Sequence, residues 1–443
     1  MSKALYVSTR GDRQTLDAAQ AIAKGLASDG GLYAPVAFPE LSLEVFEGRE
    51  SLADIAAVLV EPFVAGSVLA EDIARICQDA FSFATPLVRL SHSSSLSVLE
   101  LFHGPTAAFK DVGARFLAAC MERIEAQAEQ PLNILVATSG DTGGAVAAAF
   151  HGRRNVNVDV FYPAGGVSAR QEQQLTCWGD NIRAFRVDGR FDDCQALVKA
   201  VFQDALLMRA HRFSSANSIN LGRLLPQMCY YAYASLNVWR EEGRRPNFIV
   251  PTGNLGNALA CVWARRAGLP IGDIVLATNA NRTIPDYLGS GDWQPRQSVA
   301  TLASAMDVGN PSNMERLRHL FGEVQVVRDN VSAIAVSDEQ IRQQIVHDAQ
   351  RFDQVWCPHT ATAFYAYDQL DADRYRDHWI GVATAHPAKF ETIVEPLIHR
   401  RVDVPKSLAD ILELPASSTA ISAQLDELRS QYHSINAAPM REK

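Results

Sequence analysis

The chain has 443 residues, of which 47% are hydrophobic and 21% are charged, and its formal net charge is −9. This length predicts two or three domains around a sizeable core, and the composition is that of an ordinary globular protein. The modest acidic excess argues against a nucleic-acid-binding surface but leaves room for a local anion site.

Targeting and cysteine patterns favour a cytoplasmic protein. The N-terminal sequence MSKALYVSTRGDRQTLDAAQ lacks the apolar core of an export signal. No apolar run approaches the roughly 20 residues that span a bilayer. The seven cysteines are scattered without a Cys-x-x-Cys pair, which favours buried, reduced thiols. We therefore expect a cytoplasmic protein without zinc, disulfides or a membrane span.

Residues 1–95 are predicted to be mainly helical, with helices in 14–28 and 51–64 and a break near Pro86. From residue 132, short apolar strands bounded by glycine or proline alternate with helices. The strands are predicted at 132–139, 156–166, 182–189, 247–257, 273–281, 324–329 and 379–387, and the helices at 143–152, 167–179, 192–210, 258–268, 338–352, 358–370 and 387–400. This alternation is typical of an α/β fold with largely parallel sheets.

Lys110 lies in an apolar stretch, ELFHGPTAAFKDVG, at 100–113. Such a lysine can pair with the neighbouring Asp111 or reach solvent past an apolar surface. It can also be a reactive amine whose pKa is lowered by its surroundings so that it attacks a carbonyl. The stretch alone leaves these alternatives open.

A glycine loop at 251–260, PTGNLGNALA, follows a predicted strand and opens a helix. Gly253 and Gly256 allow tight bends, so that successive N–H groups can converge on an anion at the helix N-terminus. The loop has neither the lysine of a Walker A sequence nor the glycine order of a dinucleotide site. The alternative is a strand-to-helix turn with asparagine caps.

A second loop in the same context, ATSGDTGGAV at 137–146, adds the polar side chains of Ser139, Asp141 and Thr142. The alternative is a capped helix start. Two such loops at separate strand ends suit a ligand in the crevice beyond the carboxyl ends of a parallel sheet. A phosphorylated cofactor and an anionic substrate would need two anion sites, and pyridoxal phosphate would offer Lys110 an aldehyde.

Two further segments hold candidate ligands of such a site. SSANSINLGRLLPQ at 214–227 contains Ser218, Asn220 and Arg223, and the guanidinium could bind a phosphate or a carboxylate in paired fashion. The alternative is a surface arginine near a helix start. In GVATAHPAKF at 381–390, the hydroxyl of Thr384 could cap the next helix or meet the pyridine nitrogen of the cofactor.

Six motifs in order over almost the whole chain resemble the threonine synthase family of pyridoxal-phosphate enzymes. They are STRG (8–11), GLASDGGLYAP (25–35), HGPTAAFKD (103–111), SGDTGG (139–144), PTGNLGN (251–257) and ATAHPAKF (383–390). The resemblance implies a fold-type II (tryptophan-synthase-β-like) α/β architecture with two open, largely parallel sheets. It also implies an N-terminal region at 1–95, a smaller domain at 96–245 and a larger domain at 246–443.

The resemblance also implies roles for individual residues. Lys110 would carry pyridoxal phosphate and transfer protons, and Thr384 would face the ring nitrogen. The cofactor phosphate would lie on Gly253, Asn254, Leu255, Gly256 and Asn257. Many relatives have phenylalanine in place of Leu255, but the position contributes mainly its backbone N–H. The substrate contacts would be Ser139, Asp141, Thr142, Ser218, Asn220 and Arg223, with Ser218 and Arg223 nearest the substrate phosphate.

The implied reaction converts O-phospho-L-homoserine and water into L-threonine and phosphate, the last step of threonine biosynthesis, in a monomer or homodimer. Lys110 would be the proton carrier at Cα. The rivals are a serine or threonine dehydratase or a cysteine synthase of the same fold, and a non-catalytic binding protein. The N-terminal signature and Arg223 favour threonine synthase, because an uncharged substrate side chain needs no guanidinium. The intact lysine and glycine loops argue against loss of catalysis.

Overall fold

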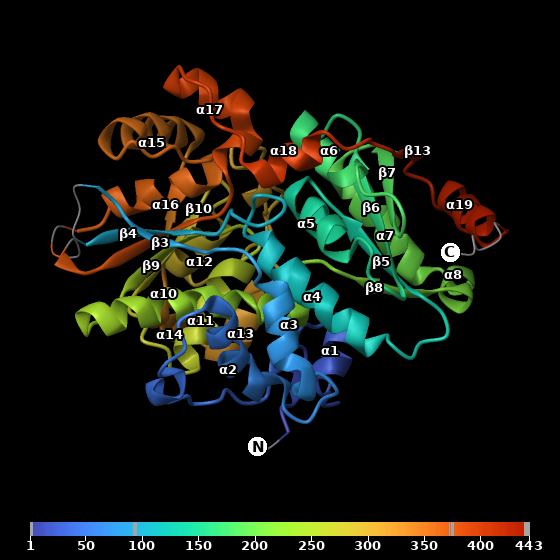
Figure 1. Cartoon of the computed structure of the whole chain (residues 1–443), viewed down its shortest axis with the longest axis horizontal. Helices are drawn as coiled ribbons and strands as arrows, with labels where there is room; N and C mark the ends of the chain where they lie inside the picture. Colours follow the sequence, from blue (N-terminus) through green and yellow to red (C-terminus); the bar gives the residue numbers. More distant parts are fainter. Residues whose placement is uncertain (1–2, 92–94, 372, 374–375, 438–443) are drawn as a thin grey trace.

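The computed structural model describes residues 3–91, 95–371, 373 and 376–437, which fold around two large sheets and a small two-stranded one (Figure 1). Among these residues, six strands form the first sheet in the order β11 (Ser332–Ala335), β10 (Ile274–Thr278), β9 (Asn247–Pro251), β12 (Trp379–Ala383), β4 (Leu96–Glu100) and β3 (Leu87–Arg89). All neighbours in this sheet are parallel except β3, which runs antiparallel to β4 at the edge.

The second sheet is wholly parallel in the described part of the chain. Its order is β13 (Thr419–Ser422), β7 (Ile182–Asp188), β6 (Val156–Pro163), β5 (Leu132–Ala137) and β8 (Arg212–Ser215). The two largely parallel sheets confirm the predicted α/β class. The central strands β5, β9, β10 and β12 are buried along their whole length, as continuous apolar runs predict.

The strands connect through helices that cover the sheets. The longer helices are α4 (Lys110–Ile124), α5 (Asp141–Phe150), α7 (Phe191–Gln203), α10 (Gln227–Glu242), α11 (Gly256–Arg266), α15 (Asp338–Arg351), α16 (Pro358–Asp368) and α19 (Leu425–Ala437). The shorter ones are α6 (Ala169–Thr176), α8 (Ala205–Ala210), α9 (Leu221–Leu224), α12 (Thr283–Ser290), α13 (Met314–Phe321), α14 (Val324–Asn330), α17 (Glu391–Ile398) and α18 (Lys406–Leu412). Figure 1 shows α4 between the strands of the two sheets.

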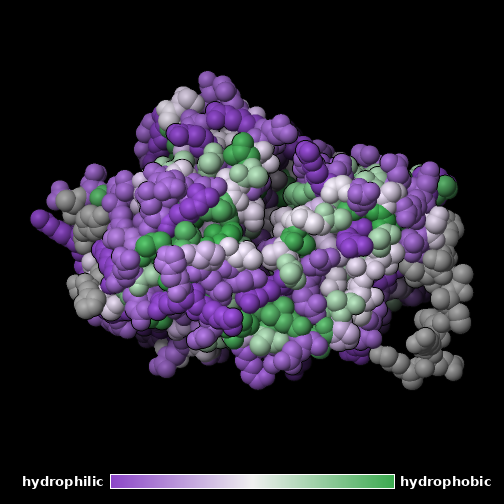
Figure 2. Space-filling view, turned by 90° about the horizontal axis from the view of Figure 1, so that it is seen from above, coloured by the Kyte–Doolittle hydropathy of each residue, from purple (hydrophilic) through white to green (hydrophobic). Residues whose placement is uncertain are grey.

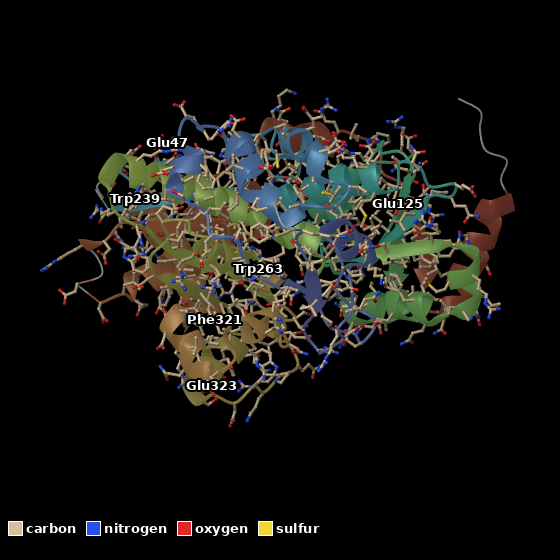
Figure 3. The ribbon with its side chains drawn as sticks, turned by 90° about the horizontal axis from the view of Figure 1, so that it is seen from below. Glu47, Glu125, Trp239, Trp263, Phe321 and Glu323 are labelled. Carbon is tan, nitrogen blue, oxygen red and sulfur yellow. The ribbon has the colours of Figure 1, made fainter. Side chains whose placement is uncertain are left out.

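The N-terminal region is helical, as predicted, with α1 (Ala18–Lys24), α2 (Leu52–Val64) and α3 (Ile73–Ala80) beside a two-stranded ribbon of β1 (Tyr6–Ser8) and β2 (Tyr33–Pro35). Several contacts anchor it to the first sheet's helices, and two of them join side chains across the boundary. Phe38 packs edge-on against Trp263 of α11, with ring centroids 5.4 Å apart, and Trp263 lies deep in the molecule (Figure 3). Arg10 forms an ion pair with Glu315 of α13 at 2.9 Å.

The strand predicted at 324–329 is wrong, because this segment forms α14. Val324, Val327 and Val331 share one face at helical spacing, and Val327 is fully buried while Val326 is exposed. The β-branched residues suggested a strand, but the burial pattern has the period of a helix. The edge strand of the sheet is β11, which begins after Val331.

Two predicted helices are interrupted. The helix at 192–210 divides into α7 and α8 at Asp204, whose carboxylate accepts hydrogen bonds from the backbone N–H groups of Leu206 and Leu207 and so caps a new helix. The helix at 387–400 begins as the short 3₁₀ helix η5 (Pro387–Phe390) and continues as α17.

The predicted ranges 96–245 and 246–443 cut across both sheets. Strand β4 lies in the first range but pairs with β12 in the six-stranded sheet. Strand β13 lies in the second range but pairs with β7 in the five-stranded sheet. The chain therefore leaves and re-enters each sheet, and its division into domains at these boundaries stays a prediction.

The face of the molecule shown in Figure 2 is mostly polar. Figure 2 shows hydrophilic residues over much of the face seen from above, with apolar residues only in scattered patches. None of the helices within the described ranges has both the length and the apolarity that crossing a bilayer requires.

Candidate active site

Lys110 stands at the start of α4, where the lysine motif meets the late motif of the chain. Phe109 N–H donates to the carbonyl of Thr384 at 2.8 Å, and His386 N–H donates to the carbonyl of Ala107 at 3.0 Å. Ala108 and Ala385 form an antiparallel bridge between these hydrogen bonds. Two motifs far apart in the sequence thus lie side by side, beyond the carboxyl ends of the neighbouring strands β4 and β12.

The alternative in which Lys110 pairs with Asp111 is wrong. The Asp111 carboxylate turns back on its own loop and accepts hydrogen bonds from Thr106 N–H at 2.9 Å and Thr106 Oγ1 at 2.6 Å. Among the residues that the structure describes, no carboxylate lies within salt-bridge distance of the Lys110 amine. Asp111 therefore shapes the turn that presents Lys110, and it leaves the amine free for other chemistry.

The environment of Lys110 favours a neutral amine. Burial lowers the pKa of Lys110 to about 8; the carboxylate of Asp141 opposes this shift, whereas Arg223 and Lys389 lower the pKa further. A substantial share of this lysine is then uncharged near pH 8, which is the form that attacks an aldehyde.

The loop between β5 and α5 is held by a residue that sequence reasoning missed. The Oγ1 of Thr138 accepts hydrogen bonds from Gly140 N–H at 3.0 Å and Gly143 N–H at 2.9 Å. Gly140 has a φ of 132°, which a residue with a side chain rarely adopts. The loop therefore bends sharply and brings Asp141 to the start of α5, while Ser139 and Thr142 remain half-buried.

Asp141 is buried and forms an ion pair with Lys389, another residue missed in the sequence. Lys389 is fully buried, and its Nζ lies 2.9 Å from Asp141 Oδ1. Burial alone would raise the pKa of Asp141, but the ammonium groups of Lys389 and Lys110 hold it well below its usual range. Lys389 could have been found by the signal that singled out Lys110, a lysine between apolar residues in a motif.

The loop between β9 and α11 has the geometry of an anion cradle. Leu255 adopts a left-handed conformation with a φ of 63°, and its side chain is buried. The first N–H groups of α11, which begins at Gly256, have no acceptor within the helix. These groups and the partial positive charge of the helix N-terminus favour an anion such as a phosphate.

Asn254 ties this loop to the segment that contains Ser218. Asn254 Nδ2 donates to Ser218 Oγ at 2.7 Å, and Ser312 N–H donates to Asn254 Oδ1 at 2.6 Å. Asn313 Nδ2 donates to the carbonyl of Asn254 at 3.0 Å. Ser312 and Asn313 are further residues that the sequence did not single out. The structure thus brings the predicted phosphate loop and part of the predicted substrate set together.

Arg223 is not a surface arginine. It is 3% exposed, its Nη1 donates to the carbonyl of Ala216 at 2.7 Å, and its buried Nε has no partner among the described residues. Burial lowers the pKa of Arg223 to about 10, and the carboxylate of Asp111 opposes this shift. A Cβ added at Gly113, one turn along α4 from Lys110, would come within 3.0 Å of Nε. The guanidinium is therefore close to the start of α4, where Lys110 lies.

Asn220 has a capping role in this structure. Its Nδ2 donates to the carbonyls of Ile22 at 2.9 Å and Ser215 at 3.2 Å, and its Oδ1 accepts from Gly222 N–H at 2.8 Å. Both amide hydrogens are used, and the residue is fully buried. This geometry gives no support to the predicted contact between Asn220 and the substrate. It explains instead how the start of α9 is fixed against α1.

Several buried polar atoms at this end of the first sheet lack a partner in the described part of the chain. They include the hydroxyls of Thr252, Thr278 and Thr384, which directly follow or end the adjacent strands β9, β10 and β12, and Nδ2 of Asn257. The Oδ1 of Asn257 is engaged by the hydroxyls of Tyr230 at 2.6 Å and Tyr231 at 2.7 Å. Because unpaired buried polar atoms are costly, they fit a site completed by a polar ligand.

The two loop glycines are expected to respond differently to substitution. A Cβ at Gly256 would meet no protein atom closer than 3.5 Å, whereas a Cβ at Gly253 would come within 2.6 Å of the Met306 backbone. We expect Gly256→Ala to weaken pyridoxal phosphate binding at least about tenfold, roughly 1.4 kcal/mol, with little loss of stability. Titration of the apo form and thermal unfolding measure the two effects.

Gly253→Ala serves as the contrast, because it should lower stability as well as affinity. The expectation that stability is spared therefore applies to Gly256 and not to Gly253. Unchanged cofactor affinity in Gly256→Ala would count against the cradle.

Comparisons with known proteins agree with this geometry. Residues 81–384 match the family model described as pyridoxal-phosphate dependent enzyme, residues 5–81 match threonine synthase N terminus, and residues 360–431 match threonine synthase, C-terminal. The site and the fold are thus those of a pyridoxal-phosphate-dependent enzyme.

Individual relatives narrow the class. Threonine synthase of Serratia marcescens is 40% identical over 414 residues, which cover 93% of this chain and 95% of that protein, and that of Escherichia coli is 39% identical with the same coverage. The crystal structure of pyridoxal-phosphate-bound threonine synthase from Brucella melitensis superposes with a TM-score of 0.91 at 33% identity, covering 98% of this chain and 100% of that one. This chain belongs to the threonine synthase family.

Proposed function

We propose that the protein is a pyridoxal-phosphate-dependent threonine synthase, which converts O-phospho-L-homoserine and water into L-threonine and phosphate. When bound, pyridoxal phosphate supplies the electron sink that stabilises negative charge at the substrate Cα. Lys110, the backbone of 253–257 and the hydroxyl of Thr384 would hold the cofactor. The unpartnered hydroxyl of Thr384 supports this assignment, as does Gly256, where a Cβ would meet no described atom closer than 3.5 Å.

Lys110 is the proposed proton carrier. Its position at the start of α4 and its lowered pKa of about 8 leave a neutral amine that can accept a proton from Cα and return it. Ser139, Asp141 and Thr142 on the neighbouring loop are proposed to orient the substrate. Ser218 and Arg223 are proposed to bind its γ-phosphate.

The observation that carries this proposal is the state of Arg223. A buried cation is costly unless an opposite charge compensates it. Arg223 has no carboxylate within salt-bridge distance among the described residues, and its Nε lacks an acceptor. An anionic group of the substrate would supply both the charge and the acceptor. The γ-phosphate of phosphohomoserine is such a group, whereas the side chains of serine and threonine are uncharged and leave only the α-carboxylate that all these substrates share.

The reaction itself tests the proposal. Purified protein supplied with pyridoxal phosphate and O-phospho-L-homoserine should release L-threonine and inorganic phosphate in equal amounts. The same preparation is then supplied with serine or threonine, and 2-oxo acid is measured. Rapid 2-oxo acid formation without threonine synthesis would favour the dehydratase and overturn the proposal. The absence of all turnover with cofactor bound would favour the binding protein.

We further propose that the enzyme works in the cytoplasm as a monomer or homodimer and binds no nucleic acid. The seven cysteines are all unpaired and buried, which suits a reducing compartment, and the net charge is −9. Light scattering on a sizing column measures the mass of the assembly in solution.

A further inference from the structure

Lys389 is fully buried, which is rare for a lysine unless partners compensate its charge. It follows β12 in the short helix η5, and its side chain is 0% exposed. Its ammonium has two acceptors, Asp141 Oδ1 at 2.9 Å and the carbonyl of Thr106 at 2.7 Å. The cost of burying an ammonium is offset only by such charged and polar partners.

These two partners belong to different parts of the fold. Asp141 opens α5 directly after β5 of the five-stranded sheet, whereas Thr106 lies in the turn that follows β4 of the six-stranded sheet and leads to Lys110. Lys389 is thus the buried ion that joins the substrate loop of one sheet to the lysine turn of the other.

Neighbouring contacts strengthen the same junction. From α6, Gln171 Nε2 donates to Asp141 Oδ1 at 3.2 Å and Gln174 Nε2 donates to the carbonyl of Thr106 at 3.1 Å. Arg170 donates to the carbonyl of Ala388, next to Lys389. The glutamine amides are uncharged and Arg170 also faces the carboxylate of Glu391 at 3.6 Å, whereas the charge of Lys389 acts on the Lys110 amine.

We propose that Lys389 is a positioning residue that fixes the substrate loop against the Lys110 turn and sets the charge balance around the Lys110 amine. The groups that act electrostatically on Lys110 are Asp141 from α5, Arg223 from α9 and Lys389 from η5. His359 of α16 acts on Asp141, and burial lowers the pKa of His359 to about 4, so that it is neutral at pH 8.

The charge balance predicts opposite effects for the two members of the pair. In Lys389→Met, Lys110 loses a like charge and keeps Asp141 as an opposite one, so its pKa should rise. In Asp141→Asn, Lys110 loses its opposite charge and keeps Lys389, so its pKa should fall. Lys389→Arg preserves the charge and should stay near the wild-type value.

The test uses the full-length apo form and does not depend on the amino-acid substrate. The rate of pyridoxal phosphate capture is followed by absorbance between pH 6 and 10, because only the neutral amine reacts. We expect the midpoint to move up by roughly one pH unit in Lys389→Met and down by about as much in Asp141→Asn. The inference rests on the proposed function, but its failure here would leave threonine formation by the wild type unaffected.

A matched control separates positioning from stability. Arg183 and the fully buried Asp159 form a second ion pair at 2.6 Å, in the five-stranded sheet and outside the site. Arg183→Met should lower the unfolding temperature without moving the midpoint of cofactor capture.

A second readout follows the loops directly. Amide hydrogen exchange at 138–144 and 104–111 should become faster in Lys389→Met and not in Lys389→Arg or Arg183→Met. If Lys389→Met left both the midpoint of cofactor capture and the amide exchange rates unchanged, the proposal would be overturned. If that variant does not fold, an unchanged midpoint in Asp141→Asn would overturn it equally.

Discussion

Replacing Lys110 with alanine is expected to abolish threonine formation while the protein remains folded. The amine forms no ion pair with any described residue, and alanine is a favourable residue in the first turn of α4. In the roles proposed for Lys110, the loss would fall on covalent attachment of the cofactor and on proton transfer at Cα. Turnover measured on the purified variant, with circular dichroism to verify folding, tests this.

The control is Lys24→Ala, which removes an exposed lysine in the last turn of α1. That variant should keep full activity. If Lys110→Ala retained more than a small fraction of the wild-type rate of threonine formation, Lys110 would not be the cofactor lysine.

Arg223→Lys is expected to weaken phosphohomoserine binding without changing cofactor binding. A lysine keeps the positive charge but lacks the planar guanidinium, whose Nη1 donates to the Ala216 carbonyl and whose Nε is available to a ligand. The loss of a hydrogen bond to a charged group is worth about 1.5–3 kcal/mol, or roughly 10- to 150-fold in affinity. Two titrations, one with an unreactive phosphonate analogue of the substrate and one with serine, measure the effect.

The control for this variant is Arg265→Lys. Arg265, in the last turn of α11, also donates only to uncharged acceptors, at Gly272 and Asn330, but it lies at the far end of that helix from Gly256. The Arg265→Lys variant should bind the phosphonate analogue and serine as the wild type does. A loss for both ligands in Arg223→Lys would mean that Arg223 shapes the site rather than binds the phosphate. No loss for either would reopen the dehydratase alternative.

Motifs that depend on local backbone geometry could be predicted from the sequence. The glycine loop at 251–260 was predicted as a strand-to-helix loop, and the structure has β9 before it and α11 after it. Lys110 was singled out by its apolar neighbours, but the strand β4 before it and the helix α4 that it opens were not predicted. The α/β class followed in the same way, from the period of apolar residues.

Contacts between distant segments could not be predicted. Asn220 is polar and next to Arg223, yet its amide binds the carbonyl of Ile22 from the N-terminal region. Asp141 was singled out for its loop, but its partner Lys389 lies in another motif. The sheet order that joins β4 to β12 likewise has no local signal, because strand pairing depends on the whole chain.

The position of β4 has a consequence for how the protein is made. The strands β5 to β8 are contiguous in the chain and pair with one another, so most of the smaller sheet can assemble while the ribosome is still translating. Strand β4, which leads to Lys110, is separated from β9 in the sheet by β12 (Trp379–Ala383). It can therefore join β9 in one sheet only after nearly the whole chain has emerged from the ribosome. We therefore expect truncated or stalled chains to be unable to capture the cofactor, so that cofactor binding marks a polypeptide whose synthesis is complete.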